Sequence, residues 1–105
     1  MPRPRKLNAR EVTASLSSLA PWTVRGGKLH REYRFVDFVT AFGFLASAAL
    51  VAERMNHHPE WFNVWNRVRV DLTTHDVGGV TVLDVTLAQA LEEMASRLPM
   101  KDRRS

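Results

Sequence analysis

The sequence predicts an α+β domain in which about three helices pack on one face of an antiparallel β-sheet of three to four strands. In three segments, apolar residues recur at intervals of three and four, which is typical of helices that bury one side. Between these segments, apolar and polar residues alternate as in half-buried strands. A Gly-Gly pair separates two such segments and indicates a hairpin. The predicted element order is α-β-β-α-β-α.

The chain of 105 residues is long enough for one domain with a single core, and we expect residues 1–105 to form it. About residues 1–7 and 100–105 are expected to be flexible tails. The composition, 45% hydrophobic and 25% charged, is ordinary for a globular protein. No cysteine is present, which excludes disulfides, thiolate metal sites and cysteine nucleophiles.

Neither a secretory signal nor a membrane span is predicted, so we expect a cytoplasmic protein without membrane contact. The basic N-terminus leads into no apolar segment. The least polar run, residues 38–52, is too short to span a bilayer. A net charge of +4 is compatible with nucleic-acid binding. Because many basic residues lie at the two ends without interleaved aromatic residues, solubilising tails are the favoured interpretation.

The first helix is predicted over residues 9–18, because Asn8 and Glu11 form a capping-box pattern. Asp37 is expected to cap the second helix. That helix carries an apolar stripe made of Phe38, Phe42, Leu45, Ala49 and Ala52, with further apolar residues beside it. So wide an apolar surface predicts packing on the sheet and also against a partner.

One strand is predicted from residue 63 to 75, with Val64 on its core face, and a bulge near Asn66 that would break this register is left open. The third helix is predicted to open at Thr86, because Thr86 and Gln89 form a second capping-box pattern, and to end at Pro99. An open edge strand or an exposed helix stripe in such a fold would favour self-association.

Two adjacent histidines, His57 and His58, lie where the second helix must end. Pro59 lacks a backbone N–H and disfavours helical geometry in the residue before it. The doublet therefore occupies a helix-to-strand corner, with Glu53 one helical turn earlier and His75 at the end of the next strand. Imidazole both gives and takes a proton near neutrality, with an unperturbed pKa of about 6.5. The pattern predicts proton-transfer chemistry without an obvious nucleophile.

Two other interpretations use the same residues. Zinc could be ligated by the three histidines with Glu53 or Asp84, but adjacent residues rarely ligate one ion and the common motif spacings are absent. We therefore expect no metal. In the purely structural interpretation, the histidines are turn residues and Trp61 belongs to the core.

Taken together, these residues resemble the pterin-4a-carbinolamine dehydratase family. The family pattern has a charged residue, three residues, His-His-Pro, an aromatic residue six positions after the Pro, then a His and an Asp. The chain matches this pattern with Glu53, His57-His58-Pro59, Trp65, His75 and Asp84. The similarity covers most of the chain, and the loop 77–83 and both termini match less well.

The resemblance implies a cofactor-free dehydration. The substrate would be a 4a-hydroxytetrahydropterin, and the products quinonoid dihydropterin and water, in the recycling of tetrahydrobiopterin after an aromatic amino acid hydroxylase. It also implies helices on one side of an antiparallel sheet, and a homodimer or homotetramer.

By position, the resemblance makes His57, His58 and His75 the catalytic residues, and it leaves open which is acid and which is base. The candidates for holding the pterin or orienting the histidines are Glu53, Trp61, Thr74 and Asp84. Two alternatives remain. One is a non-catalytic dimerisation or regulatory module, since some animal members of the family are partners of transcription factors. The other is a dehydratase of the same fold that acts on another pterin metabolite.

Overall fold

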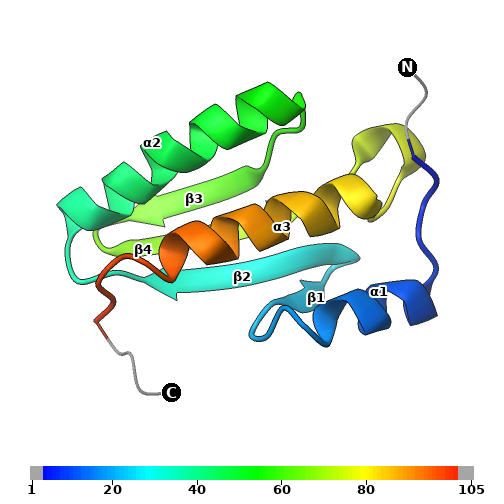
Figure 1. Ribbon diagram of the computed structural model, residues 1–105, viewed down its shortest axis with the longest axis horizontal. Helices are drawn as coiled ribbons and strands as arrows, with labels where there is room; N and C mark the ends of the chain where they lie inside the picture. The colour runs from blue at the N-terminus through cyan, green and yellow to red at the C-terminus, as the bar shows by residue number, and fades with distance from the viewer. Residues whose placement is uncertain (1–3, 102–105) are drawn as a thin grey trace.

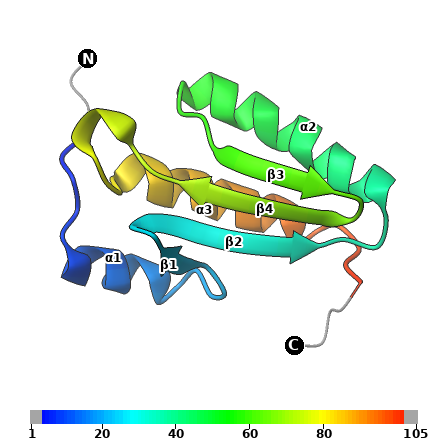
Figure 2. The same cartoon turned by 180° about the vertical axis from the view of Figure 1, so that it is seen from behind.

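A computed structural model, which describes residues 4–101, has one four-stranded antiparallel sheet with helices over one face (Figures 1 and 2). This confirms the predicted fold class. Helices α2 and α3 lie side by side across the sheet, and α1 lies beside the edge strand β1 (Figure 1). The outermost parts of the expected tails, residues 1–3 and 102–105, lie outside the described residues. In chain order the elements are α1 (Ala9–Leu16), β1 (Thr23–Arg25), β2 (Lys28–Arg34), α2 (Phe38–Met55), β3 (Glu60–Val64), β4 (Arg67–Leu72), the 3₁₀ turn η1 (His75–Val77) and α3 (Val82–Ala95).

The sheet has the strand order β1-β2-β4-β3, and every pair is antiparallel. Along β2 and β4, every second side chain points toward the helices, and the side chains between them form the opposite face. The helix-facing side is the core. Its fully buried members include Leu29, Tyr33, Phe35, Val68, Val70 and Leu72 from the strand segments and Phe44, Leu87 and Leu91 from the helices.

The segment 63–75, predicted as one strand, is two strands joined by a tight turn at Trp65 and Asn66. Trp65 has a left-handed φ of 51°. The Asn66 amide donates to the Phe35 carbonyl at 2.9 Å, which ties the turn to the end of β2. The element order is therefore α-β-β-α-β-β-α, one strand more than predicted. Because the chain reverses here, Val64 points away from the core and is exposed.

The predicted cap of α3 at Thr86 is wrong, because the observed N-cap lies five residues earlier. Thr81 is the N-cap, and its side chain accepts a hydrogen bond from the Leu83 N–H. The Asp84 carboxylate accepts one from the Thr81 N–H, which completes a capping box. Thr86 lies inside the helix and is exposed. Two capping patterns compete in this stretch, and the buried one determines where the helix starts.

Helix α2 begins where predicted, since the Asp37 carboxylate accepts a hydrogen bond from the Thr40 N–H at 2.8 Å. This bond lowers the pKa of Asp37 below its ordinary value. The buried side of α2 differs from the predicted stripe: Phe38, Phe42 and Ala49 are exposed. The residues that pack inward are Ala41, Phe44, Ala48 and Ala52. Because the helix is apolar nearly all round, its pattern fits either side, and the small alanines allow the closer approach to the sheet.

Helix α2 extends beyond the apolar run 38–52, through Glu53 and Arg54 to Met55. The helix spans 18 residues and is apolar enough, by length and composition alone, to cross a membrane. Its inward side nevertheless packs on β2, β4 and α3, as expected for a helix on a sheet. A core helix passes the same test of length and composition, so this test alone does not identify α2 as a membrane span.

Glu92 of α3 binds three side chains of the β1–β2 region. Its Oε1 accepts hydrogen bonds from the Trp22 indole at 2.9 Å, the Tyr33 hydroxyl at 2.9 Å and the Arg31 guanidinium at 3.1 Å. Trp22 and Tyr33 are buried, so water cannot replace this acceptor. Burial raises the pKa of the Tyr33 phenol, and the nearby Glu92 carboxylate raises it further. Glu92 thus fastens α3 to the sheet.

Replacing Glu92 by Ala should lower the free energy of unfolding by about 1–3 kcal/mol, because two buried donors lose their acceptor. The matched control is Glu93→Ala on the same helix, which removes only an exposed pair with Arg97 and should cost no more than about 0.5 kcal/mol. Urea unfolding of the three proteins measures both values. Equal stability of the two variants would contradict the role given to Glu92.

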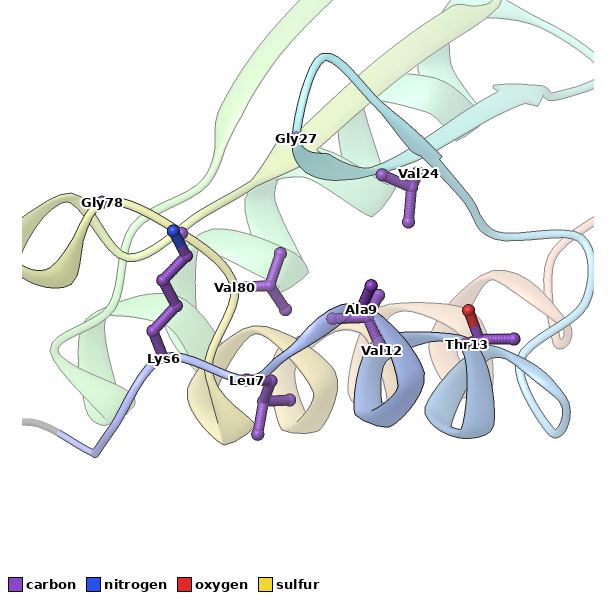
Figure 3. Close-up of a pocket in the computed structure, with 10 residues that line it drawn as sticks. Lys6, Leu7, Ala9, Val12, Thr13, Val24, Gly27, Gly78 and Val80 are labelled. Carbon is purple, nitrogen blue, oxygen red and sulfur yellow. The ribbon is translucent and has the colours of Figure 1, made fainter.

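The segment before α1 lies against the loop that follows η1 (Figure 3). The Leu7 N–H donates to the Val80 carbonyl at 2.8 Å. The stem of Lys6 crosses Gly79 so closely that a Cβ at this position would lie 2.6 Å from Lys6 Cε. Glycine is thus the residue that fits here unless the lysine side chain moves.

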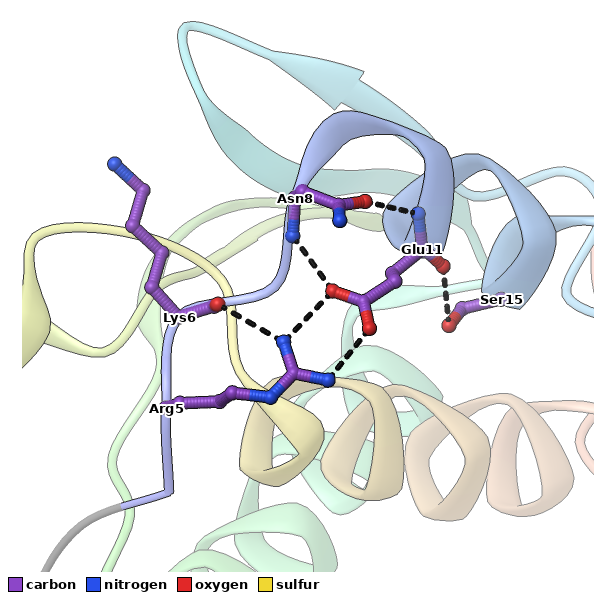
Figure 4. Close-up of polar contacts among 5 residues, drawn as sticks. All are labelled: Arg5, Lys6, Asn8, Glu11 and Ser15. Carbon is purple, nitrogen blue, oxygen red and sulfur yellow. Dashed lines mark hydrogen bonds and ion pairs between the residues drawn. The ribbon is translucent and has the colours of Figure 1, made fainter.

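The start of α1 is held by a surface network around Glu11 (Figure 4). The Asn8 side chain accepts from the Glu11 N–H, and Glu11 accepts from the Asn8 N–H, so the predicted capping box is present. The Arg5 guanidinium donates to both Glu11 carboxylate oxygens at 2.8 and 2.6 Å. The hydrogen bonds from Arg5 and from the Asn8 backbone lower the pKa of Glu11 to about 2.

This network should weaken in acid. The pKa of Glu11 is lower in the folded chain than its ordinary value of 4.5, so its stabilisation is complete above that value and is lost as the pH falls toward 2. The Glu11 carboxyl ¹³C signal and the Asn8 amide signal should therefore share a titration midpoint near pH 2, which NMR can measure. Glu11→Gln is the control and should remove the titration from the Asn8 amide. A midpoint near 4.5 would show that the network does not persist in solution.

Candidate active site

The three histidines of the motif lie near one end of the sheet, where α2 ends, β3 begins and η1 follows β4 (Figures 1 and 2). Each has a carboxylate partner from another part of the chain. The pairs are His57 with Asp84, His58 with Glu53, and His75 with Glu60. No hydrogen bond or ion pair joins two of these histidines within residues 4–101. The site is therefore a set of three separate imidazole–carboxylate pairs.

His57 is held by the way α2 ends. Asn56 adopts the left-handed conformation, which Asn tolerates, and closes the helix. The His57 N–H then returns to the Ala52 carbonyl at 3.1 Å. Its side chain is 6% exposed, and Nε2 lies 2.6 Å from Asp84 Oδ1. A short contact of this kind between an imidazole and a buried carboxylate fixes the orientation of the ring.

Asp84 is fully buried, and both of its oxygens are used. Besides contacting His57, it accepts hydrogen bonds at Oδ2 from the Thr74 hydroxyl at 2.8 Å and from the Thr81 N–H at 2.9 Å. The hydroxyls of Thr74 and Thr81 lie 2.8 Å apart. Thr74 is 2% exposed and Asp84 0%. Asp84 therefore contacts His57 directly, and Thr74 contacts Asp84. Both predicted site residues offer almost no surface to a ligand.

The other two pairs are open to solvent. His58 Nε2 lies 3.0 Å from Glu53 Oε1, and both side chains are exposed. His75 Nε2 lies 3.0 Å from Glu60 Oε2, and 73% of the His75 side chain is exposed. The other Glu60 oxygen accepts from the Lys28 ammonium at 2.6 Å. The imidazoles of His58 and His75 are therefore open to solvent, whereas that of His57 is largely buried.

Trp61 is partly buried and packs against the core from β3. The residues that sequence reasoning missed are Glu60 and Lys28. Glu60 directly follows Pro59, but its contact with His75 joins two separate segments, and no spacing in the sequence indicates it. Lys28 follows the Gly-Gly turn on the other side of β4, and no local signal marks it.

The arrangement is suited to moving protons. In all three pairs Nε2 is the ring nitrogen that faces the carboxylate. A carboxylate at one ring nitrogen favours protonation there and leaves the other nitrogen to exchange a proton. Across the described part of the chain, no three His, Asp or Glu side chains are grouped so that they could hold a metal ion.

A cavity of about 400 Å³ lies beside this region, between α1, the β1–β2 hairpin and the loop after η1 (Figure 3). No histidine lines it. Its walls are mostly apolar, and they are formed by Lys6, Leu7, Ala9, Val12, Thr13, Val24, Gly27, Gly78, Gly79 and Val80. The cavity and the histidine pairs are thus separate features that share the loop between Thr74 and Thr81.

Comparison with known proteins assigns the chain to a family. Residues 5–94 match the family model of pterin 4 alpha carbinolamine dehydratase. A Solibacter usitatus protein named as a pterin-4-alpha-carbinolamine dehydratase is 57% identical over 91 residues, which cover 87% of this chain and 96% of that protein. A protein of the same name from Rhizobium johnstonii is 49% identical over 94 residues, which cover 88% of this chain and 93% of that protein.

A solved structure agrees with these matches. The Brucella melitensis protein described as a transcriptional coactivator/pterin dehydratase superimposes with a TM-score of 0.84 at 46% sequence identity, and the match covers 87% of this chain and 99% of that one. Fold, motif and family model now point the same way. The chain belongs to the pterin-4-alpha-carbinolamine dehydratases, a family of hydro-lyases.

Proposed function

We propose that the protein dehydrates 4a-hydroxytetrahydropterin to quinonoid dihydropterin and water. The observation that carries this proposal is the presence of three motif histidines, each with Nε2 against a carboxylate. The reaction breaks the bond from C4a to the hydroxyl group and removes the proton on N5. It needs an acid for the departing hydroxyl and a base for the N5 proton. General acid–base catalysis by such groups contributes typically ~10²–10⁴-fold.

In this proposal His57 and His75 carry most of the proton transfer, through Nδ1, and His58 assists and binds. Glu53 lies on the exposed side of His58 and is a candidate to contact the pterin. Trp61 is the candidate for an apolar contact. Asp84 and Thr74 act by orienting His57, since they are buried. No metal or other cofactor takes part, and residues 1–105 act as one domain.

The protein's place in metabolism follows from this substrate. A 4a-hydroxytetrahydropterin is left when an aromatic amino acid hydroxylase has used its tetrahydropterin. We therefore propose a functional link to such a hydroxylase, a cytoplasmic location and a role in recycling tetrahydrobiopterin.

Self-association is a further part of the proposal. The outward side of α2 exposes Phe38, Val39, Phe42 and Leu50, which are 49–78% accessible. Several large apolar side chains exposed on one helix are typical of an interface. Strand β3 is also an open edge, and it bears Phe62 and Val64 on its outer side. A second copy of the chain would cover either surface, so one surface gives a homodimer and both give a homotetramer.

The competing function is a regulatory interaction module of the same fold. The observation in its favour is the exposed side of α2, together with the coactivator description of the Brucella melitensis protein. Such a module would not require three paired histidines. Action on another pterin metabolite is the second alternative, and substrate competition distinguishes it.

Stopped-flow absorbance of freshly generated 4a-hydroxytetrahydropterin should show faster decay with the protein than without it. His57→Ala and His75→Ala should each lower turnover by about 100-fold, within the range of general acid–base catalysis. The matched control is His30→Gln, because His30 pairs with Asp71 outside the motif and should turn over normally. Circular dichroism checks that all variants fold.

Wild-type turnover in both alanine variants would contradict the catalytic roles. Pterin binding without acceleration would indicate another substrate. Neither binding nor turnover would favour the interaction module.

Light scattering after size-exclusion chromatography should give the mass of a dimer or a tetramer. Phe42→Glu with Leu50→Glu should split the α2 contact, because it places charge on an apolar interface, and Val64→Lys should split a β3 contact. Gln89→Glu on the exposed side of α3 is the control and should leave the mass unchanged. A monomer at about 100 µM protein would contradict self-association, because this concentration is well above a micromolar Kd.

A further inference from the structure

Glu60 joins three parts of the structure through one carboxylate. Its Oε1 accepts a hydrogen bond from Lys28 Nζ at 2.6 Å, and its Oε2 lies 3.0 Å from His75 Nε2. Lys28 opens β2, Glu60 opens β3 and His75 opens η1. The three side chains are therefore linked in series by polar contacts, from Lys28 through Glu60 to the motif histidine His75.

The backbone fixes the position of Glu60. Its Cα pairs with that of Asp71 on β4, and Asp71 pairs in turn with His30 on β2, so Glu60 is the edge-strand member of this row. Lys28 lies two residues from His30, on the same face of the sheet. The ammonium of Lys28 on β2 thus reaches the carboxylate of Glu60 on β3.

We propose that Glu60 is a positioning residue for His75 and that Lys28 holds Glu60 in place. The inference rests on the proposed dehydratase function, in which His75 exchanges a proton with the substrate. A carboxylate facing Nε2 favours the tautomer with its proton on Nε2 and leaves Nδ1 for the substrate. Because the His75 side chain is 73% exposed, packing alone does not fix the ring.

The contribution of these contacts to folding is small. Both pairs are more than a third exposed on at least one side, and exposed ion pairs contribute little to stability. Glu60 can therefore be altered without unfolding the chain. A loss of activity in a Glu60 variant of unchanged stability would therefore reflect an altered His75 and not partial unfolding of the domain.

The test compares Glu60→Gln and Lys28→Met with the wild-type protein. Glu60→Gln should lower kcat for 4a-hydroxytetrahydropterin by about 10-fold or more, as losing the partner of a functional histidine typically does, while KM changes less than twofold. Lys28→Met should lower kcat by a smaller factor. The control is Glu32→Gln, an exposed carboxylate on β2 that pairs in register with Arg69 on β4, which should leave kcat unchanged.

The second readout is the ring ¹⁵N spectrum of His75 in the absence of substrate. The neutral ring should be protonated at Nε2 in the wild type and mixed between the two tautomers in Glu60→Gln. Unchanged kcat and unchanged tautomer in Glu60→Gln would overturn the proposal for Glu60, and a normal kcat in Lys28→Met alone would overturn the part played by Lys28. If the wild-type protein shows no turnover but the tautomer still depends on Glu60, the positioning inference stands and the proposed reaction fails.

Discussion

The structure depends most on the carboxylate of Asp84. A fully buried carboxylate is tolerated only when hydrogen bonds replace the water that it loses, and Asp84 has its partners in three places. Thr81 opens α3, Thr74 follows β4 and His57 follows α2. One ionisable group thus joins the ends of three elements. The packing of α2 and α3 on the sheet and the orientation of His57 share this single point.

Local chemistry made much of the fold predictable. Both Asn8 with Glu11 and Asp37 act as caps where the sequence placed them, because capping involves neighbours within one turn. The additional strand, which was not predicted, depends on contacts that are not local. The sequence allowed a bulge near Asn66 but did not predict a complete turn, and the turn is held by the hydrogen bond from Asn66 to Phe35, a residue far away in sequence. Long-range contacts of this type are invisible to periodicity.

The candidate site divides in the same way. The motif identified the three histidines, and Glu53 was predictable as a partner because it lies in the last turn of α2, shortly before His58 in the sequence. Asp84 was predicted near the site, but its burial and its role as a helix cap became clear only from the fold. Glu60 and Lys28 meet His75 because of the strand order β2-β4-β3, which no spacing in the sequence encodes.

The small inward residues of α2 have a consequence for how the protein can change. Ala41, Ala48 and Ala52 set the distance between this helix and the layer beneath it, and His57 lies just beyond the last of them. A larger side chain at any of the three would push α2 away from the sheet and so displace the imidazole of His57, which follows the helix. Variation in the core would then be transmitted to the chemistry, so the interior of this small domain and its reactive corner are expected to evolve together.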